Sequence, residues 1–221
     1  MKWSNILRHF VLVFLLFLTS FQLVADDGMT DTISIAAPLS APFAFEDELG
    51  EPQGFLIELF YLVEIKTGLK TNITIMPWAR AMHEVKVGRI DALMPAFYTK
   101  ERAEIFVYPK LPLTESSTVF LKRAQDDIVI DDITQLGEDK LIVKVRSMSM
   151  GQVFDDAQRA RKIKVVEVND YYQGIQMLVN SRVDLFASID YISMFLLKKR
   201  NLFDKVDILK YSTELKRFNS F

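Results

Sequence analysis

The sequence predicts an α/β fold in two lobes joined by a hinge. Residues 32–121 alternate between β-branched runs and stretches with apolar residues at helical spacing, and this order implies a parallel sheet. An acidic stretch at Gln125–Asp132 changes the composition, and residues 141–199 then repeat the alternation. The expected division is a first lobe over residues 26–121, a second lobe over residues 122–212 and a return segment over residues 213–221.

The first lobe is expected to start with a strand at Thr32–Ala37, which ends where two prolines stiffen the next loop. Residues 46–54 are acidic and contain Gly and Pro, as is typical of a hairpin or turn. Phe55–Thr67 has apolar residues at helical spacing, and Gly68 after it is a helix stop signal. Three further elements follow before Pro95, which cannot donate a ladder hydrogen bond: a strand at Thr71–Met76, a helix at Trp78–Val87 and a strand at Ile90–Met94.

The second lobe is expected to repeat the pattern. Glu115–Lys122 is a long β-type segment that carries the chain out of the first lobe. Ser149 is a natural cap for the first helix of the second lobe. The expected strands are Leu141–Val145, Ile163–Val168 and Val183–Ala187, and the expected helices are Ser149–Arg161, Asp170–Asn180 and Tyr191–Lys199. Val206–Leu209 and Tyr211–Phe221 then look like the return through the hinge.

The chain is organised around residues 88–102, where a turn, a short strand and a polar loop follow one another. Phe97 and Tyr98 come after the strand, and open α/β sheets bind ligands at the carboxyl ends of their strands. Thr99 can cap a short turn, which brings Arg102 within reach of the same crevice. An arginine on a loop is suited to grip a carboxylate through two parallel hydrogen bonds. The alternative is a solvated surface arginine in a Lys-Glu-Arg cluster.

Residues 1–25 have the features of a signal peptide. Lys2 and Arg8 form a basic start, Phe10–Leu18 is an unbroken apolar run, and Leu23-Val24-Ala25 is a plausible cleavage site. We therefore expect cleavage before Asp26 and a soluble periplasmic protein. The uncharged run is shorter than the about 20 residues that a spanning helix needs, and a retained membrane anchor is the alternative. The chain has no cysteine, so neither a lipid at the cleavage point nor a disulfide is expected.

The composition argues against several classes of function. Removing Lys2 and Arg8 with the leader takes the formal net charge from −2 to −4, because two positive charges and no negative ones are lost. A mildly acidic chain of mixed charge is not typical of a nucleic-acid-binding protein. His9 leaves with the leader and His83 has no partner ligand nearby in the sequence, so we expect no metal site and no other cofactor.

Several motifs, taken in order, resemble one protein family. Residues 88–93, Gly-Arg-Ile-Asp-Ala-Leu, and residues 98–104, Tyr-Thr-Lys-Glu-Arg-Ala-Glu, resemble the core of the bacterial extracellular solute-binding proteins of the polar-amino-acid type, family 3. The resemblance continues in Ala41–Phe45, Gly50–Phe55, Val145–Gly151 and Asn180–Asp184. It implies a two-lobe, periplasmic-binding-protein-like fold of type II and a monomeric protein that closes over a small solute.

The resemblance also implies positions for the solute. The family packs an apolar or aromatic side chain against its ligand at the position of Trp78, and Phe43 is expected to pack beside it; the alternative for Trp78 is an ordinary half-buried tryptophan. From the second lobe, the family contacts its ligand at the positions of Ser149 and Met150, where the alternative is a capped helix start. The family usually has glycine where this chain has Ser147. The methionines of this loop make the wall softer and more apolar than that of a typical amino-acid pocket.

The acid of the second lobe that pairs with a ligand ammonium in the family does not align cleanly. A fixed step after the strand Val183–Ala187 falls on Ile189, and Asp190 comes one residue later. Asp190 would bind the ligand if the loop bulges, and it fits equally well as a cap for the helix from Tyr191. The solute is therefore expected to be an amino acid, a related carboxylate or another small polar compound.

The family continues beyond the point where this sequence stops, with a strand and a helix that complete the first lobe. The resemblance therefore implies an incomplete first lobe, either in a truncated product or in a member whose first lobe is reduced. An uncovered sheet edge and apolar face carry a risk of aggregation.

These observations predict the substrate-binding protein of an ABC-type uptake system, a non-enzyme whose closed form is recognised by an inner-membrane permease. One alternative is a periplasmic enzyme that resembles the cyclohexadienyl dehydratases. That chemistry needs an acid of raised pKa inside the cleft, and the candidates are Glu46, Glu101 and Glu115. The other alternative is the sensor domain of a signalling receptor or a lytic transglycosylase, which needs a further domain or a second membrane span.

Overall fold

The structure, a computed structural model, describes residues 32–137, 139–210 and 216–219. The expected signal peptide lies outside the described residues. Within them, a sheet of three strands and a sheet of five strands carry the fold, together with two shorter sheets. Both larger sheets contribute side chains to the buried apolar core.

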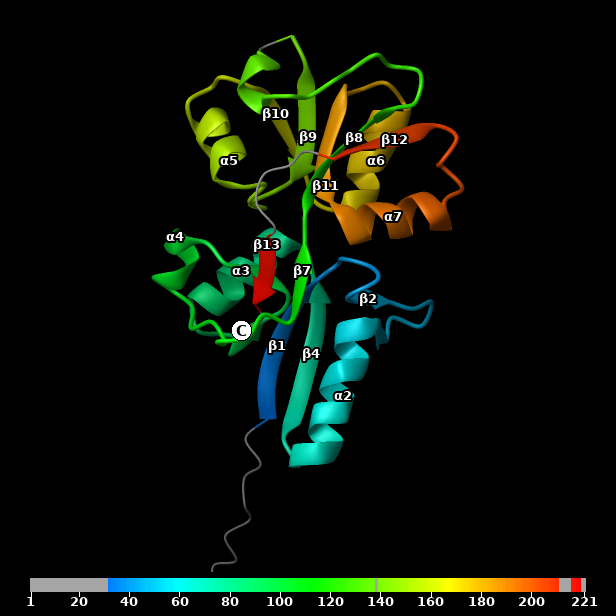
Figure 1. The fold of residues 1–221 in the computed structure, drawn as a ribbon. Helices are drawn as coiled ribbons and strands as arrows, with labels where there is room; N and C mark the ends of the chain where they lie inside the picture. Colours follow the sequence, from blue (N-terminus) through cyan, green and yellow to red (C-terminus); the bar gives the residue numbers. More distant parts are fainter. Residues whose placement is uncertain (1–31, 138, 211–215, 220–221) are drawn as a thin grey trace, which may run out of the picture. The chain divides into compact units, whose positions relative to one another are not determined.

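The first sheet has the strand order β4-β1-β5, and all of its strand pairs are parallel. Its strands β1 and β4 lie side by side in Figure 1. Its elements, in chain order, are β1 (Thr32–Pro38), α2 (Phe55–Thr67), β4 (Lys70–Met76), α3 (Trp78–Lys86) and β5 (Ala92–Leu93). The parallel sheet with alternating helices confirms the predicted pattern. The third strand is shorter than the predicted Ile90–Met94, because only Ala92 and Leu93 pair with β1.

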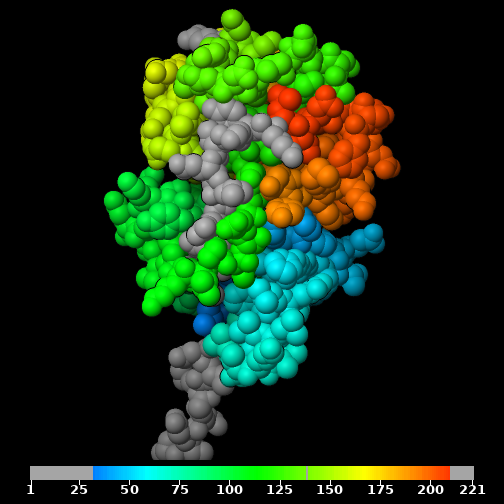
Figure 2. All heavy atoms as spheres, viewed as in Figure 1, coloured from blue at the N-terminus to red at the C-terminus, as the bar shows by residue number. Residues whose placement is uncertain are grey.

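Helix α2 occupies the predicted residues for two local reasons. One face is apolar and buried, and it comprises Leu56, Ile57 and Phe60. Gly68 then takes a left-handed backbone conformation, with φ 75°, which ends the helix as predicted. Helix α2, cyan in Figure 2, lies at the surface of the molecule. Its residues Phe55, Leu62 and Ile65 are exposed.

An aspartate joins the start of the third strand to the first strand in each half of the chain. Asp91, just before β5, accepts a hydrogen bond from Ser34 N at Oδ2 (2.9 Å), and its own amide donates to Ser34 Oγ (3.0 Å). Asp184, just before β11 (Leu185–Ile189), accepts from Leu141 N at Oδ2 (2.8 Å) and donates its amide to Leu141 O (2.9 Å). The Arg-Ile-Asp motif at residues 89–91 and the Arg-Val-Asp motif at residues 182–184 therefore make equivalent contacts between strands.

Two sheets of shorter strands complete the fold. β2 (Phe45–Glu46) and β3 (Pro52–Gln53) form an antiparallel pair, which confirms the hairpin expected within residues 46–54. The other has the order β6-β13-β7, and β13 is antiparallel to both neighbours. Its strands are β6 (Ala96–Phe97), β7 (Thr114–Ser116) and β13 (Lys216–Asn219). The last described strand therefore lies between β6 and β7, which both precede the second large sheet in the chain. Figure 1 shows β13 beside β7.

The second large sheet has the order β10-β9-β11-β8-β12, parallel over β10-β9-β11 and antiparallel at β8. Its elements are β8 (Thr118–Arg123), β9 (Leu141–Val145), α5 (Gln152–Arg159), β10 (Lys164–Val168), α6 (Tyr171–Val179), β11, α7 (Asp190–Lys199) and β12 (Val206–Lys210), with a 3₁₀ turn at Ile133–Gln135. The predicted segment Glu115–Lys122 is in fact two strands. It breaks at Ser117, because β7 pairs with β13 while β8 pairs with β11 and β12.

Two further boundaries differ from the prediction. The helix expected from Ser149 begins at Gln152, and Gly151, with φ 112°, occupies the cap position. The strand expected at Val183–Ala187 is Leu185–Ile189, since Asp184 is engaged with Leu141 before the strand begins.

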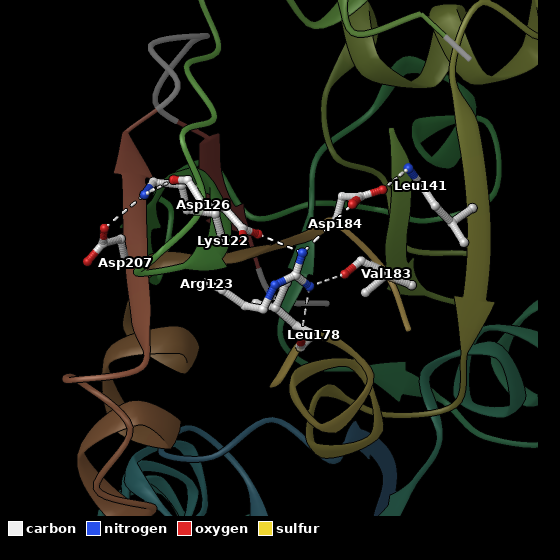
Figure 3. A network of polar contacts seen from close by, with 8 residues as sticks. All are labelled: Lys122, Arg123, Asp126, Leu141, Leu178, Val183, Asp184 and Asp207. Atoms are coloured by element: carbon white, nitrogen blue, oxygen red, sulfur yellow. Dashed lines mark hydrogen bonds and ion pairs between the residues drawn. The ribbon is translucent and has the colours of Figure 1, made fainter. Parts of the chain in front are cut away.

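Arg123 at the end of β8 ties together several segments of the second sheet (Figure 3). Its guanidinium donates to Val183 O at 2.6 Å and pairs with Asp126 Oδ2 at 2.6 Å. Next to it, Lys122 Nζ donates to Asp126 O at 2.8 Å and pairs with Asp207 Oδ2 at 3.0 Å. Because Arg123 and Lys122 are largely buried, these contacts hold the loop after β8 and the strand β12 in place.

Candidate functional site

Elements of both halves of the chain line a cavity of about 160 Å³. On one side lie the carboxyl ends of β1 and β4 and the start of α3; on the other lie the carboxyl end of β9 and the loop from β10 to α6. The lining residues are Pro38, Leu39, Glu46, Ile75, Met76, Pro77, Trp78, Val145, Met148, Asn169, Asp170 and Tyr171. Open α/β sheets bind ligands at such carboxyl ends.

A second, smaller cavity adjoins this one and shares Pro38, Trp78, Met148 and Tyr171 with it. Its volume is about 10 Å³, which is close to the space that one water molecule needs. Phe97 lines it from β6. We call the two cavities together the interlobe cleft, with the first lobe on the side of β1 and the second lobe on the side of β9.

Trp78, the first residue of α3, lies in the wall of both cavities. It is 3% exposed, and its indole Nε1 donates to Ser147 O of the second lobe at 2.9 Å. The strand β4 ends at Met76 and Pro77 caps α3, so the chain turn itself places the ring at the sheet edge. The indole hydrogen bond makes Trp78 more than a packing residue, because it joins the two lobes.

Arg102 is buried, with 6% of its surface exposed, so the alternative of a solvated surface arginine is wrong. It lies in the short helix α4 (Lys100–Ala103), which Thr99 caps by accepting the Arg102 amide at 3.1 Å, as predicted. Its guanidinium donates to Phe97 O at 3.0 Å and to Ser147 O at 3.5 Å. Its Cζ lies 4.7 Å from the centroid of the Trp78 ring.

Burial lowers the pKa of the Arg102 guanidinium, and the Tyr108 hydroxyl, Asp155 and Glu101 oppose that effect. The side chain nevertheless stays protonated, because an arginine guanidinium does not lose its proton in proteins. Within the described residues, none of the ion pairs involves Arg102. A buried positive charge whose described hydrogen bonds go to carbonyl oxygens favours the approach of an anionic oxygen.

Phe97 and Tyr98, the two other site residues predicted after β5, differ in burial. Phe97 is buried, and its carbonyl also accepts a hydrogen bond from Tyr108 Oη at 3.0 Å. Tyr98 is 52% exposed and packs edge to face against Tyr108, with 5.2 Å between the ring centroids. Burial raises the pKa of Tyr108. Phe97 therefore lies at the cleft, and Tyr98 lies outside both cavities.

Phe43 is buried in the first lobe and meets Tyr191 of the second lobe edge to face, 6.2 Å between centroids. A neighbouring contact joins β2 to α7: the rings of Phe45 and Phe195 lie 6.3 Å apart, and Lys199 Nζ lies 5.9 Å and 5.7 Å from their centroids. Aromatic contacts therefore connect the lobes beside the cleft, and Phe43 takes part in them.

Ser149 and Met150 face their own lobe. Ser149 Oγ donates to Asp155 Oδ2, and the Met150 amide donates to Asp155 Oδ1 at 3.0 Å. Met150 is buried, and its carbonyl accepts from Thr118 Oγ1 at 3.1 Å. Neither residue lines the two cavities described above; Met148 of the same loop does.

The profile of the bacterial extracellular solute-binding proteins, family 3, matches residues 33–215. The chain belongs to this family. No curated protein matches the chain. In the part of the family 3 chain that the structure describes, no helix has both the length and the apolar character needed to span a bilayer.

Solved structures similar to this family 3 chain share its fold over most of its length. A histidine kinase sensor domain with similarity to periplasmic binding proteins gives a TM-score of 0.76 at 16% identity, covering 86% of this chain and 81% of that one. An ancestral arginine-binding protein bound to glutamine gives 0.71 at 22% identity, covering 86% and 82%. A substrate-binding protein of an ABC uptake transporter from Streptococcus pneumoniae, with bound histidine, gives 0.73 at 17% identity, covering 86% and 78%. The fold is therefore the periplasmic-binding-protein-like α/β fold of two-lobe binding proteins.

Asp190 holds the crossing segment between the two sheets of this family 3 fold. Its carboxylate accepts from Ser116 Oγ, from Ser117 N (3.1 Å) and from Tyr191 N (2.7 Å). It is the first residue of α7, after the cap position at Ile189, and it does not line the two cavities. Its contacts are those of a residue that fastens β7 and β8 to α7.

The three acids considered for enzyme chemistry, Glu46, Glu101 and Glu115, are all exposed. Only Glu46 lines the larger cavity. Periplasmic enzymes of the type considered need an acid that is desolvated in the cleft. The family and its structural neighbours are mainly binding proteins, and nothing in these three side chains favours catalysis.

Sequence reasoning missed Tyr171 and the carbonyl of Ser147. Tyr171 is buried, lines both cavities, and its hydroxyl points to Met148 Sδ at 3.9 Å; burial raises the pKa of this hydroxyl. Its position at the start of α6, just beyond the short loop that follows β10, was a usable signal, because ligands of such sheets bind at the carboxyl ends of the strands. The role of the Ser147 carbonyl has no local signal, since it depends on donors 69 and 45 positions away.

Proposed function

We propose that this family 3 member is the periplasmic solute-binding protein of an ABC-type uptake system. It captures a small polar solute, an amino acid or a related carboxylate, in the interlobe cleft. The observation that carries the proposal is the cavity lined by both lobes at the carboxyl ends of their parallel strands, with Trp78 in its wall. A site divided between two lobes suits capture by hinge closure.

In this proposal Arg102 holds the carboxylate of the solute. Its burial, and the absence of an ion pair among the described residues, support that role. Trp78, Phe43 and Phe97 pack the apolar part of the solute, since all three are buried beside the cleft. Tyr98, Ser149, Met150 and Asp190 would reach the solute only after a rearrangement of their present contacts, and we assign them supporting positions around the site.

Amino acids are the first solutes to test. Similar structures are described with bound glutamine, histidine and arginine. Family membership and the expected leader support a periplasmic location and an inner-membrane permease as partner.

Isothermal titration calorimetry of the full chain tests the proposal, with arginine, histidine, glutamine, glutamate and small carboxylates such as succinate as the panel. We expect one of these to bind with a 1:1 stoichiometry, and Arg102→Lys to lose most of the affinity because an ammonium cannot reproduce the two-point fork. If no amino acid or carboxylate binds at millimolar concentration, the proposal is wrong.

A second candidate function is the sensing domain of a signalling receptor, which the similarity to a histidine kinase sensor domain favours. Uptake of a radiolabelled solute by cells that lack this protein separates the two functions. A transport component is required for uptake, so its loss should abolish uptake, whereas a sensor is not required for it. Unchanged uptake of the bound solute would favour the sensor.

A further inference from the structure

One carbonyl oxygen of the second lobe is bound by two donors of the first lobe. Trp78 Nε1 donates to Ser147 O at 2.9 Å, and Arg102 Nη2 donates to the same oxygen at 3.5 Å. The donors come from different helices, α3 and α4, and the Arg102 guanidinium also lies over the Trp78 ring. They therefore define a single acceptor position at the boundary of the two lobes.

The turn that presents Ser147 is held in place by its own lobe. The Met148 amide donates to Val145 O at 3.1 Å, so residues 145–148 form a β-turn in which Ser147 is the third residue. Ser147 has φ 59°, a left-handed conformation that favours glycine. Lys144, which is buried, donates from Nζ to Met148 O at 3.0 Å and pairs with Glu167 Oε1 at 2.8 Å. The carbonyl is thus aimed at the first lobe by contacts that do not involve the first lobe.

The acceptor position suits an oxygen that carries negative charge. A guanidinium that is largely removed from water binds a charged oxygen more strongly than a neutral carbonyl. Arg102 is such a group, because it is buried and its donors meet only the carbonyls of Phe97 and Ser147 in the contacts described. A carboxylate oxygen would therefore displace the Ser147 carbonyl, whereas an amide or alcohol oxygen would gain little by doing so.

We propose that the Ser147 carbonyl is a built-in competitor of the solute: it occupies the donors of Trp78 and Arg102 and clasps the two lobes together. This inference rests on the proposed function, since it describes the regulation of the same cleft. The protein in solute-free solution then spends most of its time closed. A solute oxygen replaces the Ser147 carbonyl as the acceptor of these donors. The affinity of the solute therefore reflects only the difference between its binding free energy and that of the carbonyl, and solutes without a charged oxygen are rejected.

The distance between the lobes in solute-free buffer tests the clasp. The sequence contains no cysteine, so spin labels can be placed on Cys substitutions of Ile65 in the first lobe and Val129 in the second, which are 80% and 72% exposed. Double electron–electron resonance on the full chain should show mainly the shorter of two distances. Trp78→Phe keeps a ring but removes the indole N–H. It should raise the ratio of the population at the long distance to the population at the short distance about fivefold.

Tyr108→Phe is the matched control. It also removes one donor to a backbone carbonyl, but the hydrogen bond from Tyr108 Oη to Phe97 O lies within the first lobe. The distance ratio of this variant should equal that of the parent protein. Lys144→Met acts from the other lobe by releasing Met148 O, and it should shift the ratio in the same direction as Trp78→Phe.

A parent protein in which the long distance dominates, or equal ratios in the parent and in Trp78→Phe, would overturn the inference. Should Trp78→Phe fail to fold, the result for Lys144→Met decides in the same way. The measurement contains no solute, so its failure leaves the proposed function standing. A failed calorimetric titration, in turn, leaves the distance measurement unaffected.

Discussion

Arg102 and Trp78 act as a pair at the cleft. The Thr99 cap fixes the backbone of α4, and the guanidinium is then directed across the Trp78 ring toward Ser147. A cation over a tryptophan face is stabilised by the ring quadrupole, more so when both are removed from water. The ring therefore helps to keep a buried charge in place while leaving donors for an anionic oxygen.

The first prediction concerns the loss of this charge. If Arg102 clamps a carboxylate, Arg102→Ala should weaken binding of the solute by about 2–5 kcal/mol, because the anion is left in the cleft without its partner. Arg102→Lys should also lose much of the affinity. Calorimetric titration of the parent and both variants measures this.

The control for that series is Arg89→Lys. Arg89 is exposed and pairs with Glu84, so its replacement should change the affinity by no more than ~0.5 kcal/mol. Similar affinities for the parent, Arg102→Lys and Arg102→Ala would exclude Arg102 from the binding site.

At the scale of elements, the entry to α2 positions the Phe43 segment. Gly54 precedes the helix with φ 121°, and the chain passes so close to Phe43 that a Cβ at Gly54 would lie 2.6 Å from Phe43 O. The Phe55 and Leu56 amides also donate to Pro42 O and Phe43 O, at 3.1 Å and 3.0 Å. The start of α2 and the loop that carries Phe43 are therefore held together as one unit.

The second prediction follows from this close approach. Gly54→Ala should lower the free energy of unfolding by about 2–4 kcal/mol, because it adds a backbone clash to an unfavourable φ. Gly50→Ala is the matched control: φ is 83° there, but an added Cβ meets nothing within 4 Å, so only about 1 kcal/mol of strain is expected. Urea unfolding measures both. Equal stability of the two variants would show that the contact with Phe43 relaxes freely.

The third prediction concerns pH and the turn before β5. Hydrogen bonds from the Ser34 hydroxyl and then from the Ser34 amide hold the pKa of Asp91 below its ordinary value. A lowered pKa in the folded state means that the charged carboxylate stabilises the fold above the ordinary pKa of about 3.9, and that this contribution is lost as the pH falls through the folded value.

Asp91→Asn should therefore be less stable than the parent at pH 5–7, and the difference should shrink below about pH 4. Urea unfolding at a series of pH values measures it, with Glu48→Gln as a control at an exposed site. A difference that stays constant down to pH 3 would show that the hydrogen bonds do not depend on the charge of Asp91.

At the scale of the whole molecule, the described residues include identifiable contacts that connect the lobes. The chain crosses from one sheet to the other at Ser117, where the Asp190 carboxylate accepts the Ser117 amide. Beside the cleft, Trp78 and Arg102 meet Ser147, and Phe43 meets Tyr191. Individual polar and aromatic contacts of this kind would allow the reversible closure that the proposed capture function requires.

The fourth prediction concerns the whole chain in the cell. Leu23-Val24-Ala25 before Asp26 is the expected cleavage site, so mass spectrometry of the periplasmic fraction should find a protein that begins at Asp26. An intact Met1 on a membrane-bound product would restore the anchor as the better interpretation.

Where sequence and structure differ, the cause is a specific contact that the residue pattern does not show. The β-segment around Ser117 is continuous in its residue pattern, but its two halves pair with strands of different sheets. Gln152 rather than Ser149 begins α5, and the Ser149 hydroxyl, which lies before the helix, donates to Asp155 of the first helical turn. In the site, the motifs pointed to Arg102 and Trp78. Tyr171 carried only the weaker signal of its place after β10, and the Ser147 carbonyl carried no local signal at all.

Local periodicity, turn residues and the ordered motifs by themselves determined the α/β class, the helix Phe55–Thr67 and its stop at Gly68, the parallel first sheet and the family. These features arise from interactions between residues a few positions apart, which a sequence displays directly. Only the tertiary structure decided that Arg102 is buried and that Trp78 Nε1 and Arg102 Nη2 share one acceptor. Burial and convergence of donors depend on how the lobes fold against each other, and no local pattern encodes that arrangement.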